Sequence, residues 1–254
     1  MDIFFDPTLI YALMLIFCRA GGLFTLAPVF SGQNVPVPIR VALAFLLATL
    51  LVPLVPVPKE TPGHFLLFVL AIGHEIVVGL LMGMAVRLVF YALELAGQIM
   101  ATEIGLIMSS SLDPVTRNES SPVTTALSYL GIVIFFASGS HHLMLVAFQR
   151  SFDLVPAAAG SFDPRVADIV VRESGRIFLL AVQMAAPLVA INFLINFSLA
   201  LLSRAAPAIN AFVLSIPIQI FAGLTVLSLV IGLTAQYVLG ALGGIPELML
   251  RFIH

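Results

Sequence analysis

The stretch "LLSRAAPAINAFVLSIPIQIFAGL", residues 201–224, decides the fold class of this chain. It contains one charged residue, Arg204, together with two prolines, Pro207 and Pro217. The flanking residues 177–203 and 205–246 carry no charge. Runs of this length can cross a bilayer, which takes about 20 mostly apolar residues. The stretch therefore predicts a membrane protein, and it raises the question of what surrounds a charge and two helix-breaking residues inside the longest apolar region.

The composition of the 254 residues points to the same class. Hydrophobic residues make up 61% and charged residues 9%, whereas soluble domains carry about 25% charged residues. The net charge of −2 gives no basic surface for nucleic acid. Cys18 is the single cysteine, which excludes an intramolecular disulfide and a metal cluster built on cysteine. We expect an all-α polytopic membrane protein, with residues 1–254 forming one helical domain.

Apolar runs separated by proline-rich or polar segments divide the chain into candidate helices. Asp2 and Asp6 precede the first cation, Arg19, unlike the positive start of a signal peptide, so we expect a retained first span. A short helix is expected over 164–174 and a polar loop over 105–122. Six or so spans are expected, of which the second is short and the third too long for one crossing. The candidates are 8–30, 41–52, 64–101, 123–148, 177–202 and 211–242, the last interrupted at Pro217.

Two short motifs begin like catalytic or metal-binding sequences but lack a required member. "HEIVVG" starts like the zinc-binding H-E-x-x-H helix at His74, yet its fifth residue is Val78. "SGSHH" at residues 138–142 offers serine and histidine without the G-x-S-x-G frame of a nucleophile. We therefore expect no catalytic residue, no metal site and no cofactor.

Charged residues inside the apolar runs give the better functional signal. A charge at the bilayer centre costs about 2.5–3.5 kcal/mol on insertion scales, so these side chains need ionic partners, water or surrounding protein. Gly79 and Gly83 form a G-x-x-x-G pattern that lets another backbone approach closely, and we expect them to pack against another subunit. The polar and charged residues expected to be buried are Glu75, Arg87, Glu94, Glu103, Arg204 and Asn210.

Broken spans combined with buried charges favour two architectures. Sixteen prolines and eighteen glycines interrupt the apolar runs. Non-helical backbone is tolerated at membrane depth only where protein or a water-filled cavity satisfies its hydrogen bonds. A transporter with discontinuous helices meets this condition, and so does a subunit that is buried within a larger complex.

Five segments, in order along the chain, resemble the FliR family, the R component of the flagellar type III export gate, related to the T component of injectisomes. The resemblance covers nearly the whole chain, and the segments around 36–44 and 206–224 favour the flagellar branch. The five segments are "FCRAGGLFTLAPVFSGQNVPVPIRVALA" (17–44), "GHEIVVGLLMG" (73–83), "ELAGQIMATEIGLIMSSSLDP" (94–114), "SGSHHLMLVAFQRSFDLVP" (138–156) and "RAAPAINAFVLSIPIQIFAGL" (204–224).

The resemblance implies a structural channel subunit of the bacterial inner membrane and flagellar basal body, through which unfolded export substrates pass. Its implied partners are the P and Q components of the gate, the switch B component and membrane lipid, and nucleic acid is not among them. The implied fold is a set of helical hairpins packed in a spiral around the export path, with an N-terminal helical part at about 1–150 and a C-terminal hairpin at about 177–246.

The resemblance also implies roles for particular residues. Arg204, Pro207, Asn210 and Pro217 would mark the bend of the C-terminal hairpin, where protein and water at the channel mouth replace lipid. A plug of the channel would lie in the polar segment after the third span, with its apolar start sealing the closed constriction. The plug residues are Gly105, Leu106, Ile107, Met108, Ser109, Ser110 and Ser111.

A second interpretation of the buried charges is a proton-coupled secondary transporter of a small solute. In that case Glu75, Glu94 and Glu103 would exchange protons with the solute pathway. A transporter is expected to be stable when purified alone, whereas a gate subunit needs its partners. An intramembrane enzyme is a third class, but no catalytic constellation supports it.

Overall fold

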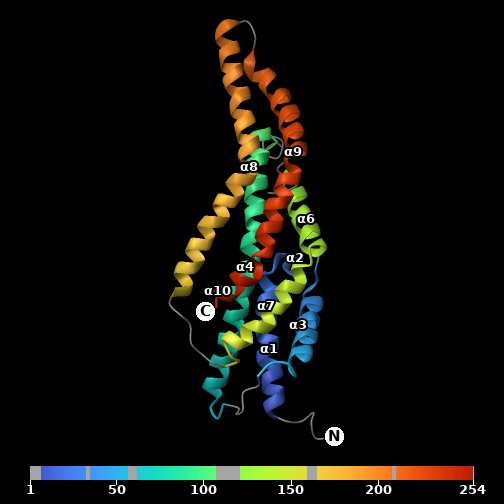
Figure 1. Cartoon of the computed structure of the whole chain (residues 1–254), viewed down its shortest axis with the longest axis vertical. Helices are drawn as coiled ribbons and strands as arrows, with labels where there is room; N and C mark the ends of the chain where they lie inside the picture. Colours follow the sequence, from blue (N-terminus) through green and yellow to red (C-terminus); the bar gives the residue numbers. More distant parts are fainter. Residues whose placement is uncertain are drawn as a thin grey trace. The chain divides into compact units, whose positions relative to one another are not determined.

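The computed structural model describes residues 7–32, 35–56, 62–106, 121–158, 165–207 and 210–253, and every regular element among them is helical (Figure 1). This confirms the all-α membrane class predicted from the composition. The helices are α1 (Pro7–Leu26), α2 (Pro28–Ser31), α3 (Val37–Leu51), α4 (Phe65–Ile104), α6 (Pro122–Ala137), α7 (Ser140–Leu154), α8 (Arg165–Ala205), α9 (Ala211–Gly243) and α10 (Ile245–Arg251).

Four of the described helices are long and apolar enough to cross a membrane: α1, α4, α8 and α9. The pair α6 and α7 adds a fifth if it is counted as one bent span. The expected number of six or so is therefore too high, because α3 has only 15 residues. At 1.5 Å per residue, the 40 residues of α4 extend about 60 Å, which is twice the thickness of a bilayer's hydrocarbon core.

Three boundaries differ from those that the sequence predicted. The expected span 123–148 is broken after Ala137 and bent by 69°, because Gly139 adopts a left-handed conformation with φ 71°. The short helix expected at 164–174 and the fifth span are one continuous helix, α8. Pro217 lies inside α9 without interrupting it, as Pro187 does in α8; prolines are tolerated in membrane helices when neighbouring groups satisfy the freed backbone carbonyl.

The chain divides into two compact units, which are described separately. The first comprises residues 1–89, 139–174 and 242–254. In it α1 packs along α3 and along the first part of α4, while α10 packs against α7. Its fully buried side chains include Leu15, Leu23 and Phe148.

The second unit comprises residues 90–138 and 175–241. Here α8 and α9 form a long hairpin, visible in orange and red in Figure 1. A Cβ on Gly97 would lie 2.7 Å from Cα of Thr124, and one on Gly223 would lie 2.6 Å from Cγ1 of Ile104. These two glycines therefore set the close packing of α6 and α9 on α4.

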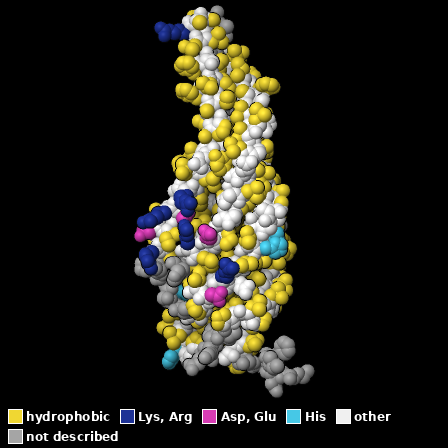
Figure 2. All heavy atoms as spheres, in the orientation of Figure 1, with side chains coloured by type: hydrophobic (Ala, Val, Ile, Leu, Met, Phe, Trp, Pro, Cys, Tyr) yellow, Lys and Arg dark blue, Asp and Glu magenta, His cyan; other side chains and the backbone are white. Residues whose placement is uncertain are grey.

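The hairpin buries little of its own surface. In the most apolar 18-residue window of α9, 6% of the residues are buried within the chain, compared with 50% for α1. Figure 2 shows hydrophobic side chains along the visible face of this hairpin, interspersed with backbone and other uncharged side chains. Lipid or other protein must therefore cover it, because an exposed apolar patch of this extent is not stable in water.

Candidate functional site

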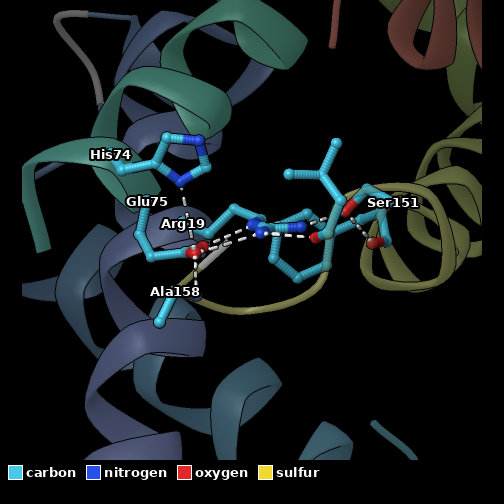
Figure 3. Close-up of polar contacts among 7 residues, drawn as sticks. Arg19, His74, Glu75, Ser151 and Ala158 are labelled. Carbon is cyan, nitrogen blue, oxygen red and sulfur yellow. Dashed lines mark hydrogen bonds and ion pairs between the residues drawn. The ribbon is translucent and has the colours of Figure 1, made fainter. Parts of the chain in front are cut away.

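A buried ion pair joins α1 to α4 in the first unit. Arg19 donates from Nε to Oε2 of Glu75 at 2.6 Å and from Nη2 to Oε1 at 3.1 Å, and both side chains are 0% exposed (Figure 3). The planar guanidinium thus meets the carboxylate at two points, which is the strongest geometry for such a pair. Each charge is neutralised where neither lipid nor water reaches it.

The rest of the guanidinium is bound by α7 and by the segment that follows it. Nη1 donates to Oγ of Ser151 at 3.0 Å, and Nη2 donates to the carbonyl of Val155 at 3.0 Å. Cζ of Arg19 lies 3.9 Å from the ring centroid of Phe152, a cation–π contact. Arg19 therefore fixes α7 and residue 155 to α1.

The carboxylate of Glu75 has two further neighbours. The backbone N–H of Ala158 donates to Oε1 at 3.1 Å, and Nδ1 of His74 lies 3.7 Å from the same oxygen (Figure 3). Ala158 has φ 66°, a left-handed conformation that alanine rarely adopts. The hydrogen bond to Glu75 aims this N–H at the carboxylate, so the pair also orders the chain after α7.

Two glycines bring the backbones of α1 and α4 together beside the ion pair. A Cβ on Gly79 would lie 2.0 Å from the carbonyl oxygen of Arg19, and one on Gly83 would lie 2.7 Å from that of Leu23. From the other side, a Cβ on Gly22 would lie 2.6 Å from the carbonyl oxygen of Ile76. The close approach predicted for Gly79 and Gly83 is thus made to α1 of the same chain, which differs from the expected packing against another subunit.

A second polar group lies in the other unit, between α4 and the hairpin. Nδ2 of Asn192 on α8 donates to Oε2 of Glu103 on α4. Nε2 of Gln219 on α9 donates to Oδ1 of Asn196 on α8 at 2.7 Å. Amide groups thus link three helices where the surrounding side chains are mostly apolar, and such links hold membrane helices together.

The predicted charged residues differ in their burial. Glu75 is fully buried, and Arg87, Glu94 and Glu103 are half-buried. Nη1 of Arg87 lies 3.5 Å from Oγ of Ser31. Arg204 in the last turn of α8 is exposed, as is Asn210 before α9, so the chain by itself does not bury these two residues, and their expected burial stays a prediction for the assembly. Among the described residues, none buries these two side chains at the tip of the hairpin.

The residues predicted to form the hairpin bend and the plug lie at three kinds of position. Pro207 follows α8 at the bend, whereas Pro217 lies well inside α9 and does not mark it. Gly105, with φ 81°, and Leu106 end α4 in a turn. The plug residues Ile107, Met108, Ser109, Ser110 and Ser111 lie outside the described residues.

Sequence reasoning missed the central member of the buried pair. The sequence marks Arg19 only as the first cation of the chain, although a single cation in an apolar run needs a partner by the same argument as Glu75. The pairing joins residues 56 positions apart, which no local pattern reveals. Among the described residues no group of three or more histidine, cysteine or acidic side chains could hold a metal ion.

Comparison with known proteins places these features in a family. The family described as "Bacterial export proteins, family 1" matches residues 10–244. The chain is 30% identical over 234 residues to the flagellar biosynthetic protein FliR of Caulobacter vibrioides, covering 90% of this chain and 92% of that protein. It is 36% identical over 223 residues to the Yop proteins translocation protein T of Yersinia pestis, covering 86% and 84%. A second flagellar biosynthetic protein FliR, from Bacillus subtilis, is 28% identical over 214 residues, covering 82% of each chain.

Proposed function

The chain belongs to the bacterial export proteins, family 1, the FliR family that its motifs predict, and we propose that it is a structural channel subunit of the bacterial flagellar type III export gate. The observation that carries the proposal is the family match over 10–244, which runs from α1 to the end of α9. In this role the subunit passes unfolded export substrates across the inner membrane and performs no chemistry. The identity to the Yop proteins translocation protein T supports a common export architecture.

The exposed hairpin supports a role inside an assembly. Large apolar side chains such as Phe193, Phe197 and Phe221 are 67%, 56% and 78% exposed, while polar Asn196 and Arg204 on the same hairpin are also exposed. Lipid can cover the apolar side chains, but it offers no hydrogen-bond or ionic partner to the polar ones. We therefore propose that neighbouring gate subunits, the P and Q components, cover this hairpin. The switch B component is proposed as the partner at the channel mouth.

The buried ion pair weighs against the transporter alternative. Glu75 accepts two hydrogen bonds from Arg19 and one from Ala158. A carboxylate held in this way is a poor proton carrier, because protonation would leave the guanidinium charge without its partner. Of the three glutamates that the transporter hypothesis needs as proton carriers, only Glu94 and Glu103 remain as candidates.

The plug remains part of the proposal. Gly105 and Leu106 turn the chain at the end of α4, and the polar sequence through Pro122 follows directly. We propose that Leu106, Ile107 and Met108 line the closed constriction, where apolar side chains exclude water.

The experiment that tests the function is deletion of the gene in the bacterium that carries it, followed by complementation. Export substrates are measured in the culture medium, and flagella and injectisome needles are counted separately. We expect loss of flagellar export and its recovery with the intact chain. Normal export in the deletion strain would refute the proposal, and loss of needles alone would assign the chain to the injectisome branch.

A further inference from the structure

The exposed side chains of α4 change their chemistry along the helix. Between residues 65 and 77 every exposed side chain is apolar, for example Leu66 at 68% and Leu70 at 60%. Between residues 78 and 90 no residue is exposed. Between residues 91 and 104 the exposed residues all carry a polar group: Tyr91, which is 44% exposed, Gln98 and Thr102. One continuous apolar helix thus presents a polar surface only over its last third.

These polar residues lie on one face. Tyr91, Glu94, Gln98 and Thr102 follow one another at intervals of three or four residues, the spacing that aligns side chains along a helix. Glu94 is half-buried, and the other three are exposed. We call these four residues the polar face. The other sides of this part of α4 are buried, and their residues are small or apolar: Ala92, Leu93, Ala96, Gly97 and Met100.

Lipid is a poor environment for the polar face. Within the described residues, the side chains of Glu94 and Gln98 form no hydrogen bond or ion pair, whereas the Thr102 hydroxyl donates to the carbonyl of Gln98 at 2.8 Å. A carboxylate and an amide without partners in hydrocarbon each cost several kcal/mol. Polar residues in membrane spans face a bundle interior or a water-filled cavity, and they often mark a substrate path. The exposed side chains of residues 65–77 on the same helix are apolar, as expected for a surface that lipid or another protein covers. The polar face differs from that surface.

We infer that the polar face lines the aqueous path along which the unfolded substrate moves. Its hydroxyl, amide and carboxylate groups exchange hydrogen bonds with water and with the backbone of an extended polypeptide, and they require no particular side chain on the substrate. A single carboxylate, Glu94, adds one negative charge without making a specific binding pocket. The inference rests on the proposed function and adds to it the wall of the path.

The single cysteine of the chain makes a direct test possible. Cys18 is replaced by alanine, and one cysteine is introduced at Gln98 or Thr102 in the bacterium that carries the complete export apparatus. Control cysteines replace Val133 and Phe193, which are 62% and 67% exposed but apolar, and Leu93, which is 1% exposed. Variants that still export are treated with a membrane-impermeant methanethiosulfonate bearing a charge, and modification is measured by mass.

A stalled substrate supplies the second arm. An export substrate fused to a tightly folded domain is expressed to occupy the path. We expect modification of Gln98→Cys and Thr102→Cys, loss of that modification when the stalled substrate is present, and no modification of the three controls in either condition. The inference would be contradicted if the control cysteines were also modified and the stalled substrate blocked their modification to the same extent.

The remaining outcomes are distinguishable. Modification of the polar face without protection would place it in water outside the path, and absence of modification would mean that another subunit or lipid covers it; either result overturns the inference. Recovery of the stalled substrate with the tagged chain is measured in parallel. If the substrate is recovered but the polar face is unprotected, only the inference fails; if no substrate is recovered with the chain, the proposed function fails.

Discussion

Arg19 on α1 and Glu75 on α4 form a fully buried, two-point ion pair, with N–O distances of 2.6 and 3.1 Å. Their helices touch through glycines at the same level, and α7 contributes Ser151 to the pair. The first unit is thus organised around a neutralised charge as well as around an apolar core.

Loss of one member of this pair is expected to be costly. Arg19→Leu leaves the Glu75 carboxylate buried without a cation, and breaking a buried pair in this way costs about 3–5 kcal/mol. We expect strongly reduced amounts of the protein and of its complex in membranes, measured by immunoblot and by native gel.

The double variant Arg19→Leu with Glu75→Leu is the matched control. Replacing both charges with apolar side chains removes the unpaired charge, and such replacements are often close to neutral. We expect the double variant to recover a large part of the protein level. Equal losses for the single and double variants would show that packing of the arginine side chain, and not its charge, is what the unit requires.

The glycine contact between α1 and α4 gives a second prediction. A Cβ on Gly79 would lie 2.0 Å from a backbone oxygen, so Gly79→Ala must separate the two helices. Overpacking typically costs about 1–3 kcal/mol. Gly73→Ala on the same helix is the control, because a Cβ there meets nothing within 4 Å. We expect a lower protein level for Gly79→Ala only; similar levels for both variants would argue against tight packing at Gly79.

Arg204 tests whether the tip of the hairpin is used in the assembly. The side chain is exposed in the chain by itself, so a partner or water must meet it in the complex. We expect Arg204→Leu to abolish assembly or export and Arg204→Lys to be partly tolerated, since lysine keeps the point charge but not the planar fork. Export is measured in the culture medium. Normal export by the leucine variant would mean that the charge is not required.

The proposed plug gives a further prediction. Deletion of residues 106–118 should leave assembly intact but make the membrane permeable to ions and small solutes. The measurement is entry of a small dye into cells that contain the complete complex, with the intact chain as control. A tight membrane with normal assembly would return this segment to the role of a surface loop.

The sequence predicted the helical class and the approximate apolar segments because hydrophobic composition is a local property. It did not predict the break at Gly139, where the backbone is left-handed, because glycine is also common inside unbroken membrane helices. It predicted an interruption at Pro217 that α9 does not show, because a membrane helix tolerates proline where a soluble helix would be broken.

For the site, the sequence indicated Glu75 as a charge that needs a partner but not the identity of that partner. Pairing with Arg19 depends on how α1 and α4 cross. The sequence also did not separate buried charges from exposed ones: Glu75 and Arg204 both lie in mainly apolar stretches, yet tertiary packing buries Glu75 and leaves Arg204 exposed.

The central claim is that this chain is a channel subunit of an export gate, and one purification tests it most directly. The chain, tagged after His254, is isolated in mild detergent from membranes that contain a stalled export substrate, and the bound proteins are identified by mass spectrometry. The account predicts one complex that contains the chain, the P and Q components and the stalled substrate. A chain that is recovered alone, stable and without substrate would contradict it and would favour the proton-coupled transporter.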